Sequence, residues 1–172
     1  MIDAESAIIV AVDECYGFGK DGKIPWHFKE DFQYFKKMTK GATCVMGRKT
    51  YEDLLGYAKT DELLPGRKCY VVTSSEEPLQ KGAKRLSDPY EDLPEDCVGG
   101  PVFYIGGAGI FDAALDFVDE VYMTHIRRNY DCDVSFPYAK LEEKFQLADN
   151  PYAPVLDQEL ARTLLFERWV RK

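Results

Sequence analysis

The sequence has few of the residues from which metal centres and disulfide frameworks are built. Only two histidines, His27 and His125, occur among the 172 residues, so a site with several histidine ligands is not expected. The five cysteines are odd in number, widely scattered and without a CxxC pair. This pattern argues against both a disulfide-stapled domain and a zinc site. We therefore expect no metal, and reduced cysteines that serve as small apolar residues.

Basic charge and long apolar runs are also scarce. The formal net charge is −8, which is unsuited to nonspecific nucleic-acid binding. No apolar run approaches the roughly 20 residues that span a membrane. The stretch MIDAESAIIVAV has acidic residues where a secretory signal would carry positive charge. We expect a cytoplasmic protein that binds neither nucleic acid nor membrane.

The hydrophobic content is sufficient for one core. With 45% hydrophobic residues in 172, the chain supports one sizeable core rather than two. No internal repeat, low-complexity tract or linker divides it. The expected organisation is a single domain over residues 1–172. No exposed apolar stripe is evident in the sequence, so we expect a monomer.

Short apolar runs alternate with amphipathic segments. The runs predict strands buried on both faces, at residues 7–12, 42–46, 68–73 and 102–105. Helical patterns lie at residues 28–39, 50–55 and 107–118. Further strands, with no helices between them, are expected at residues 120–127, 144–148 and 163–171. The pattern predicts an α/β fold with a mixed, mostly parallel sheet, flanking helices and antiparallel C-terminal strands.

One acidic residue interrupts the apolar stripe of a predicted helix. In IPWHFKEDFQYFKKM, residues 24–38, a helix advancing about 100° per residue places Asp31 among Phe28, Phe32, Phe35 and Met38. A carboxylate there is destabilising unless it is paired, and burial raises its pKa. Asp31 either caps or flanks a core helix or pairs with a buried arginine, or it is a functional acid in an apolar pocket.

Three predicted strands are followed by turns suited to an anion. The turns are GRKT at residues 47–50, TSS at 73–75 and GGAG at 106–109. Glycines let the backbone approach a phosphate, hydroxyls donate hydrogen bonds, and a following helix offers free N–H groups. Arg48 adds the forked donors that favour NADP over NAD. Each turn alone would pass as an ordinary connection, but three at one sheet edge indicate a phosphate-bearing ligand.

Taken in order, these and neighbouring stretches resemble the dihydrofolate reductase family. The matching stretches are residues 8–12, GFGKDGKIPW at 17–26, DFQYFK at 31–36, VMGRKTY at 45–51, LPGR at 64–67, IGG at 105–107 and YMTHI at 122–126. The resemblance implies a dihydrofolate-reductase-like fold and NADPH as cofactor. It also implies reduction of 7,8-dihydrofolate to tetrahydrofolate, by hydride transfer to C6 and protonation at N5.

The same resemblance assigns the substrate site. Asp31 would bind the pterin ring and either raise its proton affinity or order water, and Thr124 would hydrogen-bond to Asp31. Trp26 would hold that water, and Ile24 would shield the site. Arg67 in LPGR, which could otherwise be a solvated surface charge, would bind the α-carboxylate of the glutamate tail. The remaining cleft walls would be Ile9, Val10, Phe32, Phe35, Leu54 and Ile105.

The resemblance also assigns the cofactor site. The nicotinamide end would meet Ala11, Phe18 and Gly19. The phosphates and the adenosine end would meet Gly47, Arg48, Lys49, Thr50, Thr73 and Ser74. Gly106 and Gly107 fit the family's cis Gly-Gly peptide, which would lead the pyrophosphate onto Ala108, Gly109, Ile110 and Phe111. The glycine-rich segment 14–24 resembles the loop that closes over the active site.

Two other functions remain open at this point. A pyrimidine reductase of riboflavin synthesis has a similar fold and also uses NADPH, but its substrate carries a ribityl phosphate. Asp31 in its apolar stripe and the LPGR turn favour the folate. A nucleotide-binding protein without catalysis is the second alternative. The presence of Trp26, Asp31 and Thr124 argues against it.

Overall fold

The computed structural model describes residues 2–97 and 100–172, which build one large sheet and one small one. The strands of the large sheet are β1 (Ser6–Val12), β3 (Thr43–Gly47), β4 (Lys68–Val72), β5 (Lys84–Leu86), β6 (Val102–Tyr104), β7 (Glu120–Ile126), β9 (Phe145–Ala148) and β10 (Leu164–Arg171). Their spatial order is β5-β4-β3-β6-β1-β7-β10-β9. The small sheet pairs β2 (Gly17–Gly19) with β8 (Val134–Ser135).

Strand directions match the predicted mixed sheet. Neighbouring strands from β5 to β7 are parallel, and β10 is antiparallel to both β7 and β9. The predicted strands agree with the observed ones to within one residue at either end. The fold class predicted from the sequence is therefore confirmed.

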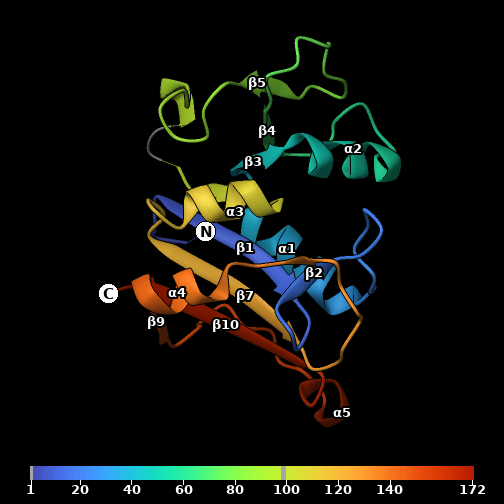
Figure 1. Cartoon of the computed structure of the whole chain (residues 1–172), viewed down its shortest axis with the longest axis vertical. Coiled ribbons are helices and arrows are strands. Elements are labelled where there is room, and N and C mark those ends of the chain that lie inside the picture. The colour runs from blue at the N-terminus through green and yellow to red at the C-terminus, as the bar shows by residue number, and fades with distance from the viewer. Residues whose placement is uncertain (1, 98–99) are drawn as a thin grey trace.

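Helices cover both faces of the large sheet (Figure 1). They are α1 (Lys29–Thr39), α2 (Arg48–Tyr57), α3 (Ala108–Ala114), α4 (Tyr138–Lys144) and α5 (Gln158–Ala161), with a 3₁₀ turn at Glu95–Cys97. The side chains of α1 and α2 enter one apolar layer, and those of α3 and α4 enter the other. In the described ranges, no helix is long and apolar enough to cross a membrane.

Two expectations about the helices were wrong. The helix expected over residues 107–118 ends at Ala114, because the next N–H groups of Asp116 and Phe117 bond three residues back and tighten the last turn. The C-terminal strands are separated by α4 and α5, where none were expected. Both are too short, at seven and four residues, for an apolar period to be read from the sequence.

The alternation of side chains along β1 explains its continuous apolar run. Ile8, Val10 and Val12 lie in the layer beneath α3, whereas Ala7 and Ile9 lie in the layer beneath α1 and α2. Because β1, β3, β4 and β6 run parallel, their carboxyl ends meet at one edge of the sheet. The anion-suited turns after three of these strands therefore lie at the same edge.

Candidate active site

The turns after β3 and β6 are joined through their backbones. The N–H of Gly47 donates to the carbonyl of Gly106 at 2.7 Å, and the Gly106–Gly107 peptide is cis, as expected. A Cβ on Gly106 would lie 3.0 Å from the Thr50 hydroxyl oxygen, and its φ of +135° is unsuited to other residues. The backbone at this edge can be this close only because glycine occupies it.

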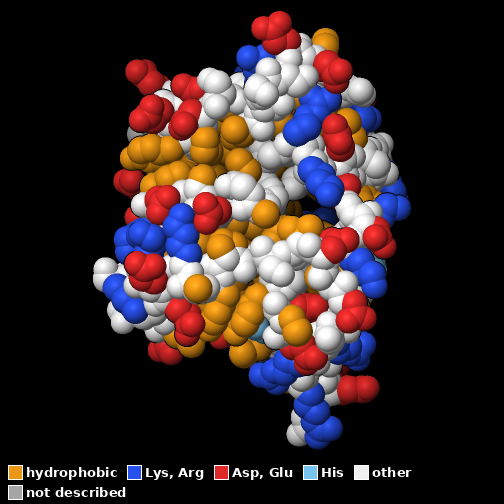
Figure 2. All heavy atoms as spheres, in the orientation of Figure 1, with side chains coloured by type: hydrophobic (Ala, Val, Ile, Leu, Met, Phe, Trp, Pro, Cys, Tyr) orange, Lys and Arg blue, Asp and Glu red, His pale blue; other side chains and the backbone are white. Residues whose placement is uncertain are grey.

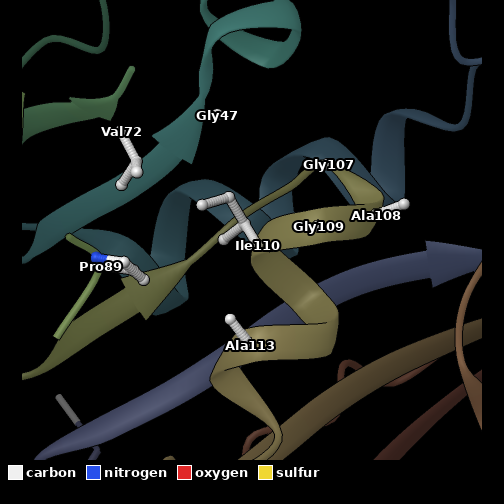
Figure 3. A pocket seen from close by; sticks show the side chains of 8 residues that line it. All are labelled: Gly47, Val72, Pro89, Gly107, Ala108, Gly109, Ile110 and Ala113. Carbon is white, nitrogen blue, oxygen red and sulfur yellow. The ribbon is translucent and has the colours of Figure 1, made fainter. Parts of the chain in front are cut away.

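A groove of about 390 Å³ opens beside these glycines. Figure 3 shows Val72, Pro89, Ile110 and Ala113 around it, with Gly47 and Gly107 contributing backbone. Ala108 and Gly109 also line it and are exposed. Its wall is therefore apolar side chains on one part and bare backbone on the other. Phe111 does not line it: that side chain is 1% exposed and packs edge-on against Phe18, with ring centroids 5.2 Å apart.

Arg48 begins α2 beside this groove. Its Nε lies 3.0 Å from Glu52 Oε1, and one terminal nitrogen, Nη2, lies 3.0 Å from Glu77 Oε2. The other, Nη1, is buried and has no hydrogen-bond partner. In the next turn Thr73 is partly buried, and Ser74 is exposed. Arg48 thus has one buried nitrogen whose hydrogen-bonding capacity is unused.

The side chain of Lys49 lies toward Gly22, whereas that of Arg48 contacts Glu52 and Glu77. Its Cε lies 3.6 Å from the position that a Cβ on Gly22 would occupy. Lys49 therefore lies against the loop of residues 14–24. Figure 2 shows the surface hollowed between α2 and the segment around β2, with Lys or Arg side chains beside the opening.

Asp31 lies in the first turn of α1 and is partly buried. Burial raises the pKa of its carboxyl, and a hydrogen bond with the Thr124 side chain offsets part of that rise. Thr124 is 2% exposed and pairs with Ala11 across β7 and β1. Asp31 is not the helix cap, since Phe28 occupies that position without a side-chain bond. In the described part of the chain, Asp31 has no ion-pair partner either, so it neither caps the helix nor pairs with a buried arginine.

Most of the predicted cleft walls lie in one apolar layer. Ile9, Phe35, Leu54 and Ile105 pack in the layer beneath α1 and α2. Trp26 belongs to the same layer and is 7% exposed. Two further predicted residues are exposed, Phe32 at 43% and Ile24 at 58%.

Val10 does not join this wall. Its side chain packs in the opposite layer, beneath α3, because neighbouring residues of a strand point to opposite faces. Ile9 therefore meets the layer beneath α1 and α2 with its side chain, and Val10 can contribute to a cleft there only through its backbone.

Arg67 is held against the carboxyl end of α1. Its Nε donates to the Thr39 hydroxyl at 3.0 Å, and its terminal nitrogens donate to the carbonyls of Lys36 and Pro65. Thr39 is fully buried and in turn donates to Phe35 O at 2.8 Å. Arg67 is therefore a cation fixed at the end of α1 and not a freely solvated charge.

One charged residue that the sequence did not single out organises the neighbouring loop. The fully buried carboxylate of Asp13 accepts N–H groups from Cys15 at 2.9 Å, Gly17 at 2.9 Å and Tyr130 at 3.0 Å. Burial pushes the pKa of Asp13 upward, but these bonds and one from the Cys132 thiol more than offset that effect and lower it. An acid directly after a buried apolar run was the available signal.

The contacts around Asp13 also reach the apolar layer beneath α1 and α2. The Tyr130 ring contacts the Trp26 ring edge-on, with centroids 5.2 Å apart. Gly19 pairs with Val134 between β2 and β8, and the N–H of Asp21 donates to the Asp133 carboxylate at 3.0 Å. The loop of residues 14–24 is therefore fastened to residues 130–135 along its length.

Comparison with known proteins agrees with this geometry. Residues 5–171 match the sequence family described as dihydrofolate reductase. The dihydrofolate reductase of Bacillus subtilis is 36% identical over 136 residues, covering 76% of this chain and 74% of that protein. Dihydrofolate reductase type 9 of Escherichia coli is 29% identical over 174 residues, covering 95% and 91%. A solved structure of dihydrofolate reductase from Enterococcus faecalis, complexed with NADP(H) and RAB-propyl, aligns with a TM-score of 0.76 at 27% identity, covering 97% of this chain and 96% of that one. The chain belongs to the dihydrofolate reductase family.

Proposed function

We propose that this chain catalyses the NADPH-dependent reduction of 7,8-dihydrofolate to 5,6,7,8-tetrahydrofolate, supporting one-carbon and thymidylate metabolism. The observation that carries the proposal is Asp31, a partly buried carboxylate that forms a hydrogen bond with Thr124. It lies on α1, which covers an apolar layer, and a glycine-lined groove lies at the carboxyl edge of the sheet. An apolar slot with few polar groups suits an aromatic heterocycle. Membership of a family of NADPH-dependent reductases supports the same activity.

The substrate would span from Asp31 to Arg67. Asp31 would accept hydrogen bonds from the 2-amino group and ring nitrogen of the pterin, while Ile9, Phe35, Leu54 and Ile105 pack against the rings. Phe32 at the rim would cover the middle of the molecule. The guanidinium of Arg67 would bind the α-carboxylate of the glutamate tail, and its bonds to the end of α1 hold it in place beforehand.

The residues at the sheet edge fit NADPH. Glycines at 47, 106 and 107 allow a pyrophosphate to approach the backbone, and the apolar side of the groove suits an adenine. The buried, unpartnered Nη1 of Arg48 is a donor for the 2′-phosphate. Thr50, Thr73 and Ser74 would add hydroxyl donors. When bound, NADPH supplies the hydride that is delivered to C6 of the substrate.

The remaining residues assigned to the cofactor site differ in whether they would touch NADPH directly. Ala11, Phe18 and Gly19 would lie at the nicotinamide, and Ala108, Gly109 and Ile110 would lie along the pyrophosphate. Phe111 would support Phe18 from the core and would not touch the cofactor, because it is buried. Lys49 would reach the phosphates only by leaving Gly22.

The chain's own residues would manage the proton. Asp31 is the ionisable group nearest the proposed pterin position, and it would raise the proton affinity of N5 or order the water that protonates it. Trp26 would hold that water, and Ile24 would exclude bulk solvent when the loop closes. The raised pKa of Asp31 fits a carboxyl that works in a poorly solvated cleft.

We further propose that residues 1–172 act as a single domain and as a monomer in the cytoplasm. The match of one family over residues 5–171 supports the single domain. Gel filtration with light scattering would test the monomer, and a mass near 39 kDa, twice the 19.7 kDa of one chain, would overturn it.

The decisive assay follows loss of NADPH absorbance with purified protein and dihydrofolate. Parallel reactions use NADH in place of NADPH, and the riboflavin-pathway pyrimidine in place of dihydrofolate. Oxidation that depends on dihydrofolate supports the proposal. Turnover of the pyrimidine alone would assign the second reductase activity, and tight NADPH binding with no turnover would favour a binding protein.

A further inference from the structure

Arg48, the proposed partner of the 2′-phosphate, already has two acidic neighbours. Glu52 is one helical turn further along α2, and Glu77 comes from the segment after β4. Both contacts are 3.0 Å, and the side chains of Glu52 and Glu77 are 58% and 75% exposed. The Glu52 contact is an ordinary pair within one helix. The Glu77 contact joins two separate segments and calls for a different explanation.

The turn after β4 is shaped to present Glu77. The N–H of Ser75 donates to the Thr73 hydroxyl at 3.1 Å, and the N–H of Glu77 donates to the Ser75 hydroxyl at 3.2 Å. Arg85 donates to the carbonyl of Ser75 at 3.1 Å. Two successive turns stabilised by hydroxyl groups, together with the bond from Arg85 in β5, therefore fix the backbone conformation up to Glu77. Its carboxylate faces Arg48 from the same turn that carries the proposed adenosine contacts.

We infer that Glu77 is a specificity-determining residue that competes with the 2′-phosphate of NADPH for Arg48. This inference rests on the proposed function. A 2′-phosphate that bonds to Arg48 must either displace the Glu77 carboxylate or lie beside it. If it lies beside it, the negative charges of the phosphate and the carboxylate repel each other. A 2′-hydroxyl makes no such demand, because a carboxylate can accept its hydrogen bond.

The arrangement predicts a weakened preference for NADPH. Arg48 favours the phosphate, while Glu77 disfavours it and accommodates NADH. Because Glu77 is exposed, the repulsion is screened, so its removal should change affinity by about three- to tenfold and less at high salt. Ligands without a 2′-phosphate should be nearly indifferent to the same change.

The test compares Glu77→Gln with Glu76→Gln. Both variants remove one negative charge from neighbouring exposed positions, but only Glu77 contacts Arg48. Isothermal titration calorimetry with adenosine 2′,5′-bisphosphate and with adenosine 5′-monophosphate measures nucleotide binding without turnover. Dissociation constants for NADPH and NADH are measured in parallel at low and high salt.

We expect Glu77→Gln to bind the bisphosphate and NADPH about three- to tenfold more tightly at low salt, with the monophosphate and NADH changed less than about twofold. Glu76→Gln should resemble the unmodified protein. If both variants bind the bisphosphate more tightly by the same factor, the effect is due to net charge alone. If Glu77→Gln binds it more weakly, Glu77 positions Arg48 and does not compete with the phosphate. Either result overturns the inference. If neither the unmodified protein nor either variant binds NADPH, the proposed function fails as well. If Glu77→Gln turns over dihydrofolate normally and its ratio of NADPH to NADH affinity is unchanged, only the inference is refuted.

Discussion

Replacing Gly17 with alanine tests how the loop of residues 14–24 is held against residues 130–135. A Cβ at this position would lie 2.3 Å from Cys132 Cβ, 2.9 Å from its Sγ and 3.3 Å from Asp13 Oδ1. Carbon atoms pack at about 3.5–4.0 Å, so the two segments would have to separate by more than about 1 Å. Separation would also lengthen the bond from the Gly17 N–H to Asp13, now 2.9 Å.

The expected effect is a lower free energy of unfolding of the whole protein, caused by the clash between residues 14–24 and residues 130–135. Overpacking typically costs about 1–3 kcal/mol, which for a chain of this length lowers Tm by roughly 2–12 °C. The backbone φ of Gly17 is not positive, so steric conflict and not backbone strain is responsible. Thermal unfolding followed by circular dichroism measures the change.

A double-mutant cycle identifies the conflicting atom. Because the shortest contact is with the Cβ of Cys132, Cys132→Gly relieves it and Cys132→Ala does not. The coupling free energy between Gly17→Ala and Cys132→Gly should therefore be favourable by about 1–3 kcal/mol. The coupling free energy between Gly17→Ala and Cys132→Ala should be much smaller. An unchanged Tm for Gly17→Ala, or equal rescue by both partners, would refute the proposed packing.

Three further changes test other contacts. Arg67→Ala should raise KM for dihydrofolate at least about tenfold with little change in kcat, and an unchanged KM in steady-state assays would place the tail elsewhere. Arg48→Ala should reduce the ratio of NADPH to NADH affinity, and an unchanged ratio in binding titrations would mean that the 2′-phosphate has another partner. Asp13→Ala leaves three N–H groups without their acceptor, at a cost of about 1–3 kcal/mol at pH 7 for each one that stays buried. Because the folded-state pKa of Asp13 is lowered, its stabilisation is present above the unfolded-state pKa and is lost as pH falls through the folded value. Urea unfolding should therefore show the two proteins converging in acid, and a constant difference would contradict this.

The sequence was sufficient for the central strands of the large sheet because they are continuous apolar runs, whereas the edge strand β5 was not predicted, because two of its three residues are charged. Residues 7–12 and 102–105 needed no partner to be recognised, and both are strands. The small sheet could not be predicted in the same way. β2 contains two glycines in three residues, and β8 has two residues, so neither has a strand-forming pattern of its own. Their pairing depends on contacts more than 100 positions apart in the chain, which no local pattern encodes.

The candidate site was predicted unevenly for similar reasons. Asp31 could be recognised because helical period and polarity conflict at one position, a local signal. The bond to Thr124 came only from the resemblance, since the two residues are far apart in sequence. Asp13 was missed although it follows a buried apolar run, because its partners at Gly17 and Tyr130 are backbone N–H groups that no residue type reveals. Glu77 was not singled out from the sequence, because its contact with Arg48 joins segments 29 positions apart.

The most direct test of the proposed chemistry is single-turnover hydride transfer in Asp31→Asn as a function of pH. Glu30→Gln, which removes the same charge from the same turn of α1, serves as the matched control. If Asp31 promotes protonation of the pterin, the rate at pH 7 should fall by about 100-fold or more, with a smaller loss in acid where solvent supplies the proton. Glu30→Gln should keep the full rate. A near-normal rate for Asp31→Asn at pH 7, with NADPH bound, would show that this carboxyl is not required for the reaction.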